Sequence, residues 1–497
     1  MLMLNDKVLS TLKKGSGISV MSTLVRDMTR GNTTKLLISF SIPMLIGNIF
    51  QQLYNLADSA IVGRGVGPFA LAAVGSTGSL SFLFFSFCIG VANGGGITAS
   101  KYFGAKDDEK VKKVIVNGAY MMLAASVLMA ILGYVLAAPV LRLLDTPEDI
   151  IDVATMYLRI MCLGIPFIGL YNYASAMLRA LGDSVTPLIF LVVSCFINIG
   201  FDCLFVYVFG WGVFGAAIAT LIAQFLSGFA CLLFAYFKND YFKIKREYIK
   251  PDMKIIGECA RMGSMLALQM SLIAVSCLAL QRYVNGFGPM TMAVFTAVGR
   301  IEQIVQQPYG SLGMALSTHA GQNLGARNYK RIKEGFGKGM LIMAAFSAIV
   351  LPLAQFGGET IMKIFTEEPE IITMGAKALR ITSAFYFTLG TIYVCRGVLN
   401  GIGDAGFALI NGVVEVIGRI GFPLLLTLFP VIGVWGIWLS AGLTWFISGL
   451  FAFIRYAVKI RNAKFIASVS DAENCAAVRS DHLAKKACVT VLHSKAS

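Results

Sequence analysis

Long stretches of hydrophobic residues run along this chain, separated by short polar loops. Apolar stretches of about 20 residues have the length of helices that cross a bilayer, and they are longer than the strands of a membrane barrel. We predict twelve such spans, with approximate limits of 36–62, 69–97, 115–139, 155–180, 188–208, 213–237, 256–283, 290–318, 338–356, 377–400, 407–429 and 433–458. The predicted fold class is therefore an all-α polytopic membrane protein.

The first span carries a polar stripe within its apolar sequence. Four polar residues, spaced three, four and three apart, share one face of the predicted helix: Asn48, Gln51, Asn55 and Asp58. A carboxylate is costly in hydrocarbon, so we expect Asp58 to face the protein interior or a wet cavity. The stripe predicts either a functional site or a polar seam that holds helices together.

An internal repeat is the second feature of the pattern. The segment Ala99–Lys113 resembles Ala320–Glu334, with Gly104 aligned to Gly325 at an offset of 221. The same offset aligns residue pairs in other loops: Gly67-Pro68 with Gly288-Pro289, Gly182-Asp183 with Gly403-Asp404, and Gly212-Val213 with Gly433-Val434. We infer two copies of a six-span unit in the same orientation, a plan in which transporters bind substrate between the repeats. The alternative is a duplication that is kept only for packing.

The charges of the loops predict the orientation. Lysine and arginine residues cluster after spans two, six and eight, whereas acidic residues cluster after spans three and nine. Because basic loops face the cytoplasm, we expect both termini to be cytoplasmic. The predicted divisions are a cytoplasmic segment 1–35, an N-lobe 36–240, a linker 241–255, a C-lobe 256–460 and a disordered cytoplasmic tail 461–497. The first 34 residues show no secretory signal, and both Met1 and Met21 are possible starts of translation.

Composition agrees with a membrane protein and narrows the function classes. Hydrophobic residues make up 57% of the chain and charged residues 14%, against about a quarter in soluble domains. The net charge of +15 lies mainly in loops between spans, so it does not indicate a nucleic-acid partner. The ten cysteines show no metal-binding spacing, and the spans contain no HExxH or GxSxG motif. We therefore expect no enzyme and no resident cofactor or metal.

The two repeats differ at their polar intramembrane positions. Residues Ala279, Arg419, Pro423 and Ala441 of the second half align with four polar residues of the first: Asp58, Asn198, Asp202 and Thr220. Two carboxylates, an amide and a hydroxyl suit a hard cation such as Na⁺. They suit a proton equally, because two close carboxylates in a dry site can share one. We predict a cation site at these four residues, with hydrogen bonding between helices as the alternative role.

Other residues in the spans are candidates for the wall of a substrate cavity. Those of spans one and eight are Gln51, Tyr54, Asn55, Arg300, Gln303 and Gln306. For Tyr54 the alternative is plain packing, since aromatic residues are common in these spans. Glu415 and Arg419 are four residues apart and can neutralise each other on one helix face, so we predict a structural pair there.

Several motifs resemble those of a known family. The segment IPMLIGNIFQQLYNLADSAIVGR at 42–64, the basic GA-containing loops after spans two and eight, and NIGFDCLFVYVFGWGVFGAA at Asn198–Ala217 resemble the multidrug and toxic compound extrusion (MATE) family. The similarity extends from about Met28 to about Arg461 and keeps the order of the segments. One branch of the family has a glutamate in the seventh helix, where this sequence has Gln269, which joins the cavity candidates. The sequence looks closer to the DinF-like branch.

The resemblance implies twelve helices in two pseudo-symmetric six-helix lobes that form a V around a central cavity. It implies export of small organic compounds, often cationic, in exchange for H⁺ or Na⁺ bound in the N-lobe by Asp58, Asn198, Asp202 and Thr220. We expect a monomer in the bacterial inner membrane, with the coupling ion and membrane lipid as its other partners. One alternative is an exporter of a single metabolite. Another is a flippase for lipid-linked oligosaccharides, which needs cationic cavity residues such as Arg300, Arg396 and Arg419.

Overall fold

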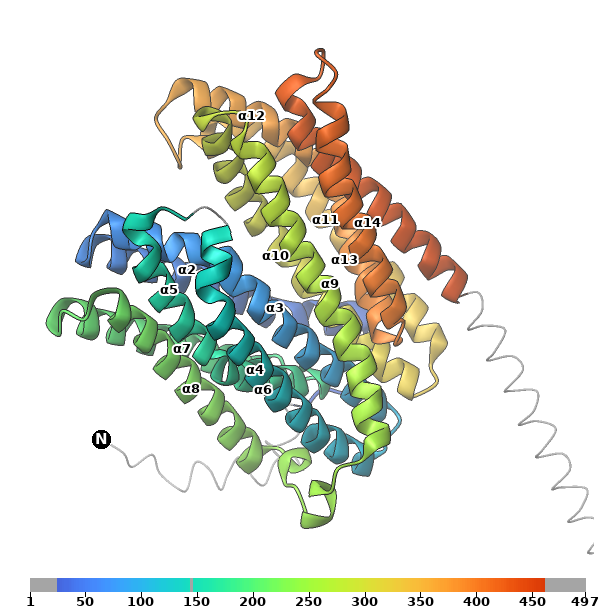
Figure 1. The fold of residues 1–497 in the computed structure, drawn as a ribbon. Helices are drawn as coiled ribbons and strands as arrows, with labels where there is room; N and C mark the ends of the chain where they lie inside the picture. Colours follow the sequence, from blue (N-terminus) through green and yellow to red (C-terminus); the bar gives the residue numbers. More distant parts are fainter. Residues whose placement is uncertain (1–24, 144–145, 461–497) are drawn as a thin grey trace, which may run out of the picture.

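The computed structural model describes residues 25–143 and 146–460, which form an all-helical protein (Figure 1). The helices of the first half are, in order, α2 (Thr33–Gly65), α3 (Pro68–Gly104), α4 (Asp108–Leu143), α5 (Glu148–Leu163), α6 (Ile165–Ala180), α7 (Val185–Asp202), the π-helix η2 (Cys203–Val208) and α8 (Gly212–Lys238). Two short 3-10 helices, η3 (Asp240–Phe242) and η4 (Arg246–Ile249), lead into the second half.

The helices of the second half are α9 (Met253–Asn285), α10 (Pro289–Gly325), α11 (Tyr329–Met362), α12 (Pro369–Ser383), α13 (Tyr386–Gly401), α14 (Ala405–Leu426), the 3-10 helix η5 (Gly433–Trp435) and a last helix at 436–460. Several of these helices begin at residues that favour a helix start. Both α3 and α10 begin with proline, which suits the first turn because its missing N–H has no partner there in any case. The side chains of Asn32, Asp252 and Asn328 accept hydrogen bonds from the first turns of α2, α9 and α11.

The internal repeat is visible in the helix boundaries. Adding 221 to the bounds of α3 gives those of α10, and adding 221 to the bounds of α6 gives those of α13. The loops repeat as well. Lys106 and Arg327, which are 221 residues apart, are the non-glycine residues of the described chain with positive φ, at 58° and 55°. The structure therefore confirms the repeat that the sequence predicts.

Two of the predicted spans are broken helices. The span predicted at 155–180 consists of α5 and α6, which are bent by 44°, and the span predicted at 377–400 consists of α12 and α13, which are bent by 49°. Pro166 lies in the first turn of α6 and cannot donate a backbone hydrogen bond to the preceding turn, which favours the first break. The equivalent break at Phe385 contains no proline, so its cause lies outside the local sequence.

The number of spans differs from the predicted twelve when length and apolar character alone are considered. Among the described residues, nine helices are long and apolar enough to cross a membrane, and the two bent pairs raise the count to eleven. The remaining predicted span is α10, which has the length of its repeat partner α3. Its lower apolar character comes from Arg300, Glu302 and three glutamines that line a cavity: Gln303, Gln306 and Gln307.

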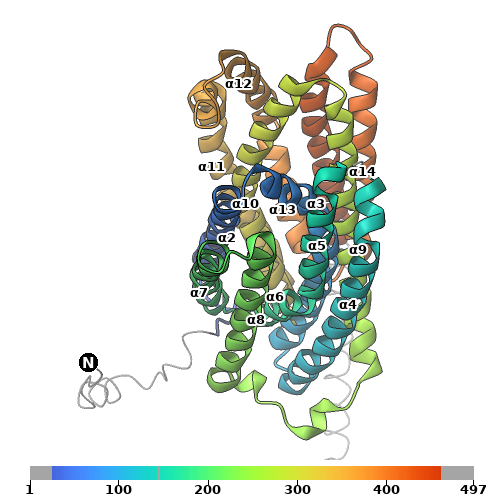
Figure 2. The ribbon, with the colours of Figure 1, turned by 60° about the vertical axis from the view of Figure 1, so that its left-hand side comes forward.

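The two halves lie side by side (Figures 1 and 2), and the first helix of each half also packs against the core of the other half. Leu37 and Phe40 of α2 pack in the hydrophobic core of the second half, and Ile255 and Cys259 of α9 pack in the core of the first. These contacts lie at the end of the molecule that carries the α3–α4 and α10–α11 loops, and we call it the inner end. At the opposite, outer end the two halves diverge and form a V (Figure 1).

Small residues join the two halves along α3 and α9. Gly90 and Gly94 of α3 face Ala267 and Gly263 of α9, and a Cβ added at either α3 glycine would lie 2.3 Å from the backbone of α9. Small residues allow helix backbones to approach closely within a membrane. The two helices therefore form the main seam between the halves.

The inner end is closed by α3, α10 and the segment before α2. Gly104 and Gly325, which are repeat partners, lie where α3 and α10 cross. The side chain of Gln322 is fully buried: its Oε1 accepts a hydrogen bond from the backbone N–H of Met28 (2.8 Å), and its Nε2 donates to the carbonyl of Ala180 (2.9 Å). A buried amide with partners on two other segments favours a single arrangement, so Gln322 locks the two halves together here.

Candidate functional site

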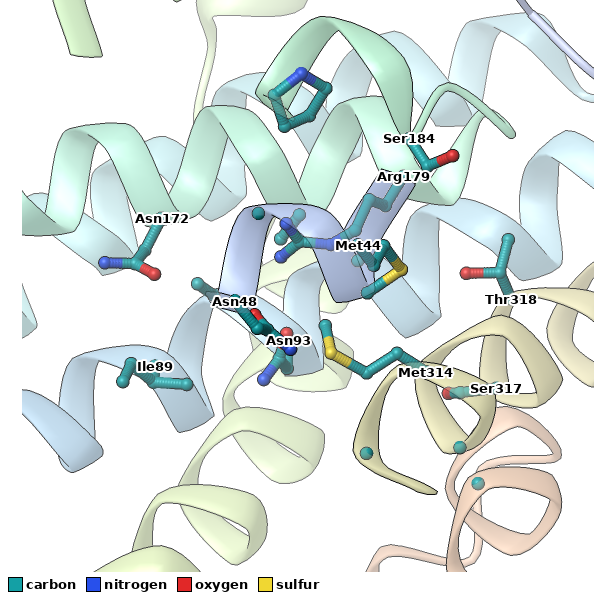
Figure 3. A pocket seen from close by; sticks show the side chains of 18 of the residues that line it. Met44, Asn48, Ile89, Asn93, Asn172, Arg179, Ser184, Met314, Ser317 and Thr318 are labelled. Carbon is teal, nitrogen blue, oxygen red and sulfur yellow. The ribbon is translucent and has the colours of Figure 1, made fainter. Parts of the chain in front are cut away.

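A central cavity of about 540 Å³ lies between the two halves (Figure 3). Its polar wall consists mainly of amides: Asn48, Gln51, Asn93, Asn172, Gln303, Gln306, Gln307 and Asn400. Its apolar wall includes Met44, Ile89, Leu188, Leu191, Leu266, Met270 and Met314. The lining also contains two tyrosines and two arginines: Tyr171, Tyr393, Arg179 and Arg396. This volume, with a few polar groups in an apolar wall, is typical of a small-molecule site.

Three of the predicted cavity residues line this cavity: Gln51 of α2, and Gln303 and Gln306 of α10. The Gln306 Oε1 accepts a hydrogen bond from the hydroxyl of Tyr393 (3.0 Å), which fixes the amide against α13. Asn48, one turn before Gln51, donates from Nδ2 to Ser311 Oγ of α10 (3.3 Å). The walls contributed by α2 and α10 are thus in direct contact.

The structure places the other predicted cavity residues outside this lining: Tyr54, Asn55, Gln269 and Arg300. The hydroxyl of Tyr54 points to α8 and donates to Thr220 Oγ1 (3.5 Å). Asn55 and Arg300 are exposed and lie nearer the outer ends of α2 and α10 than Gln51 and Gln303, so the predicted stripe of α2 is divided between two environments. Gln269 is buried between α9 and α14 against Gly412. Helical spacing groups residues by face, but tertiary packing decides which face meets the cavity.

The residues of the predicted cation site lie together on α2, α7 and α8 of the first half. Asn198 and Asp202 are one turn apart on α7. With the Asn198 amide oriented to satisfy both neighbours, its nitrogen donates to Asp202 Oδ2 (2.9 Å) and its oxygen accepts from the backbone N–H of Thr220 (3.2 Å). Asp58 is buried on α2 within electrostatic range of Asp202. The fold thus gathers four residues from three helices.

One carboxylate oxygen of each acid in this cluster lacks a partner. Asp58 Oδ1 and Asp202 Oδ1 are buried, and neither accepts a hydrogen bond from the residues that the structure describes. At Asp202 the α-helix changes into the π-helix η2, and π-helical turns are frequent at functional sites. Two buried acids with available lone pairs, next to an amide and a hydroxyl, fit a bound proton or a bound Na⁺.

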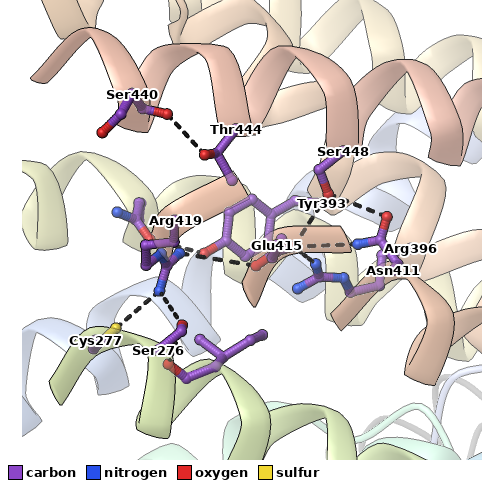
Figure 4. A network of polar contacts seen from close by, with 12 residues as sticks. Ser276, Cys277, Tyr393, Arg396, Asn411, Glu415, Arg419, Ser440, Thr444 and Ser448 are labelled. Atoms are coloured by element: carbon purple, nitrogen blue, oxygen red, sulfur yellow. Dashed lines mark hydrogen bonds and ion pairs between the residues drawn. The ribbon is translucent and has the colours of Figure 1, made fainter. Parts of the chain in front are cut away.

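The corresponding helices of the second half carry a buried ion cluster instead (Figure 4). Glu415 of α14 is ion-paired with Arg396 of α13 and also accepts hydrogen bonds from Asn411 (3.1 Å) and Ser448 (3.3 Å). The predicted pair of Glu415 and Arg419 is present at 3.9 Å. Arg396 is nevertheless the closer partner of Glu415, and the spacing of residues along one helix does not reveal a partner on another helix.

Arg419 occupies the repeat position of Asn198 but has different neighbours. Its guanidinium donates to Ser276 Oγ (3.3 Å) and to Cys277 Sγ (2.8 Å) of α9 (Figure 4). The acid that would correspond to Asp202 is Pro423 in this half. The oxygen-rich cluster is therefore a feature of the first half and is not repeated in the second.

A family model matches more than half of the chain. The MatE model matches residues 43–204 and 266–425, one segment in each half of the fold. The chain belongs to the MatE family. Membership places it among transporters and not among enzymes, as the sequence predicts.

Known relatives and solved structures agree with MatE membership. The chain is 30% identical over 371 residues to Probable multidrug resistance protein YoeA of Bacillus subtilis, over 73% of this chain and 80% of YoeA. It is 31% identical over 380 residues to Probable multidrug resistance protein YpnP of the same organism, over 76% of this chain and 84% of YpnP. The structure of a MOP superfamily transporter from Pyrococcus furiosus matches with a TM-score of 0.83 and 24% identity, over 89% of this chain and 99% of that chain. The predicted fold class is thereby confirmed.

Further residues of this MatE-family cavity escape the sequence analysis, among them Asn93, Asn172, Arg179 and Asn400. Arg179 and Asn400 are repeat partners at the offset of 221, and they lie in the last turns of α6 and α13. The alignment of the two halves carries the signal that would find Arg179, because a basic residue within a span aligns there with a neutral amide.

Proposed function

We propose that this protein is a secondary active antiporter that exports small organic compounds, drugs or toxic metabolites among them, in exchange for H⁺ or Na⁺. Membership of the MatE family and the names of YoeA and YpnP, which mention multidrug resistance, support export of varied compounds. The cavity supports the same function. Three methionines in its wall, Met44, Met270 and Met314, have flexible side chains that adapt to ligands of different shape.

The partnerless oxygens of Asp58 and Asp202 carry this proposal. A buried carboxylate without a partner is strongly unfavourable, so an ion that binds during the transport cycle supplies what the protein lacks. In this proposal the exchanged H⁺ or Na⁺ binds at four residues of the first half: Asp58, Asn198, Asp202 and Thr220. Both ions fit the carboxylate, amide and hydroxyl oxygens of the cluster.

Helix α2 connects the proposed cation site to the cavity. Asp58 lies seven residues, or about 10 Å along the helix, from Gln51, which lines the cavity. Pro43 also lines the cavity and interrupts the backbone hydrogen bonding of α2, so the helix can bend there. Cation binding at Asp58 changes the charge on the outer half of α2, moves Gln51 and releases the substrate. Departure of the cation on the other side of the membrane resets the transporter.

The proposal also places the chain in its membrane. The inner end faces the cytoplasm because the basic loops α3–α4 and α10–α11 lie there, which makes both termini cytoplasmic. The N-lobe is 36–240, the linker 241–255 and the C-lobe 256–460. The expectations for residues 1–24 and for the tail 461–497 fall outside the described residues. Bacterial relatives support a bacterial inner-membrane protein, which we propose to be a monomer of the DinF-like branch.

A flippase for lipid-linked oligosaccharides has less support. It needs cationic cavity residues for a diphosphate, and of the predicted candidates Arg300, Arg396 and Arg419 only Arg396 lines the cavity. The charge of Arg396 is balanced by Glu415. This leaves Arg179 as the one unpaired cation of the described lining, whereas a diphosphate calls for several. Export of small compounds therefore fits the cavity better. Competition between a lipid-linked precursor and a small dye for the cavity would reverse this preference.

Dye efflux from membrane vesicles tests the antiport proposal. Gradients of pH and of Na⁺ are imposed separately on vesicles that contain the wild type, Asp58→Asn, or the matched control Asp240→Asn, whose carboxylate is exposed after α8. We expect one gradient to drive efflux in the wild type and the control, and neither gradient to drive it in Asp58→Asn. Wild-type efflux by Asp58→Asn at normal expression would refute the cation site. Failure of both gradients to drive efflux of any cationic or anionic dye would refute antiport.

A further inference from the structure

The charge of the central cavity bears on the class of substrate. The described residues that line it include no aspartate, glutamate, lysine or histidine, and its charged residues are Arg179 and Arg396. A site built for organic cations is expected to offer carboxylates or several aromatic faces. This cavity offers amides, two guanidinium groups and two tyrosines. An organic cation would therefore enter a cavity whose wall carries positive charge.

The two arginines are not equivalent. Arg396 is ion-paired with Glu415, a nearly fully buried carboxylate that does not line the cavity (Figure 4). Arg396 therefore brings little net charge to the cavity, and the substrate is not needed to neutralise it. The net positive charge of the wall comes from Arg179.

Arg179 has no counter-charge among the residues that the structure describes. It lies in the last turn of α6, and it lines the cavity together with Asn48 and Asn93 (Figure 3). Its side chain makes no ion pair or hydrogen bond with a described residue, and no carboxylate lies among the residues that line the cavity. An uncompensated cation within a membrane protein is costly and points to a functional role.

Two structural explanations for Arg179 are weaker. The negative end of the α6 dipole favours a cation, but by less than it costs to hold that cation inside a membrane. The fold does not require an arginine at this place either, because the repeat partner at the same turn of α13 is Asn400. The arginine is therefore best explained by a ligand with a single binding site, on the side of the first half.

We propose that Arg179 binds a carboxylate of the exported compound, so that the substrates are organic acids or zwitterions and not simple cations. The inference rests on the proposed export function and narrows the expected preference for cationic drugs. Arginine presents parallel N–H donors that match the two oxygens of a carboxylate. The amides of Asn48 and Asn93 supply further donors, and the methionine and leucine side chains of the wall receive the apolar body of the compound.

A pair of dyes that differ in one group tests this inference. Rhodamine 110 carries a free carboxylate, and rhodamine 123 is its methyl ester and a simple cation. Their affinities for the purified full-length protein are measured by fluorescence polarisation in detergent. We expect the wild type to bind rhodamine 110 at least about tenfold more tightly, as hydrogen bonds to a charged group imply. Each result is a ratio of two affinities for one preparation, so a misfolded fraction cancels.

Three variants separate the role of Arg179 from a structural one. Arg179→Gln is expected to bring the affinity ratio close to one, and Arg179→Lys is expected to retain part of the preference. Arg142→Gln, which removes an exposed arginine at the end of α4, is expected to keep the wild-type ratio. A wild-type preference for rhodamine 123, or an unchanged ratio in Arg179→Gln, would overturn the inference. Binding of neither dye would also overturn the inference. The antiport itself is tested separately, by gradient-driven efflux of dyes from vesicles.

Discussion

Replacing Gly104 by alanine is expected to weaken the closed inner end and to populate the state that is open there. A Cβ at Gly104 would lie 1.8 Å from the carbonyl oxygen of Gln322 and 2.6 Å from its Cα, whereas real Cβ contacts stay above 3.0 Å. Both atoms belong to the backbone of α10, so a change of side-chain rotamer cannot remove the clash. The inner ends of α3 and α10 must therefore move apart.

The size of the effect follows from the cost of overpacking. Extra methyl groups in close-packed positions cost about 1–3 kcal/mol. A cost of this size that acts on the closed state alone shifts the population about 5- to 150-fold toward the open state. Separation also stretches the hydrogen bonds of Gln322 to Met28 and Ala180. The repeat partner Gly325 meets the same constraint, with a Cβ 1.9 Å from the carbonyl oxygen of Lys101, so Gly325→Ala is expected to act in the same direction.

Cysteine labelling measures the shift. A cysteine replaces Ser317 in the cavity wall, in a protein whose ten native cysteines are replaced. A membrane-impermeant maleimide is then applied to oriented vesicles from each side. With Gly104→Ala, labelling is expected to become faster from the side of the inner end and slower from the outer side. Thermal unfolding in detergent shows whether the variant is folded.

Gly78→Ala is the matched control, because Gly78 lies in the same helix and a Cβ there would have no neighbour within 4 Å. This variant is expected to label as the wild type does. If Gly104→Ala has the wild-type unfolding temperature and unchanged labelling from both sides, the crossing of α3 and α10 is not what closes the inner end, and the reasoning is refuted.

Three further variants probe the remaining clusters. Asp202→Asn is expected to abolish gradient-driven efflux but to leave dye affinity unchanged, since Asp202 lies outside the cavity; efflux and binding measured on one preparation test this. Glu415→Gln leaves Arg396 buried without its counter-charge and is expected to lower the free energy of unfolding by about 3 kcal/mol or more, visible as a lower unfolding temperature. Asp183→Ala removes the acceptor for the backbone N–H groups of Val185 and Thr186 at the start of α7 and is expected to cost about 1–2 kcal/mol in the same assay.

The sequence predicts where the long helices lie but not their ends: α4 begins seven residues before the predicted limit at 115, and α11 nine residues before the predicted limit at 338, because only the apolar middle of a helix must match the bilayer. The signals for the ends are nevertheless present in the sequence. Prolines at 68 and 289, polar caps such as Asn32, and the apolar stretches between them are readable without tertiary contacts. The α10 helix shows the limit of hydropathy. It has the length of a span, yet its cavity glutamines reduce its apolar character, and only its alignment with α3 identifies it as the repeat of a span.

Local sequence indicates the break in the fourth span, through Pro166, but gives no signal for the break in the tenth, and the packing at the two breaks is related. At the first break a Cβ on Gly164 would lie 1.8 Å from the side chain of Leu221. At the second break the ring of Phe385 fills the space above Gly442, where a Cβ would lie 2.2 Å from the ring. Gly164 aligns with Phe385, and Leu221 aligns with Gly442, at the offset of 221. The two halves fill the same gap from opposite sides, and a residue pair of this kind is visible only in three dimensions.

The cation cluster was more accessible to sequence reasoning than the cavity. Asn198 and Asp202 share a face of one helix, and their absence from the second half singles them out. The cavity also depends on how far it extends along each helix, which spacing alone does not determine. For this reason Asn55 and Arg300, although they lie about one turn from Gln51 and Gln303 on the same helices, lie outside the cavity wall. The ion pair of Arg396 with Glu415 joins two helices and has no signal along either one.

The departures from the repeat indicate how one symmetric scaffold supports an exchange of two ligands. Gly104 and Gly325, which allow α3 and α10 to cross, are kept at equivalent places in both halves. Asp58 and Arg179 are not kept, since the second half has neutral residues at both positions. In an antiporter, the coupling ion and the substrate act on the same conformational equilibrium but must not compete for one site. An acidic residue beyond the cavity and a basic residue within it meet this requirement. Both residues lie in the first half, so in the proposed antiport that half carries the coupling, and the second half supplies the opposing wall of amides and the closing contact of Gln322.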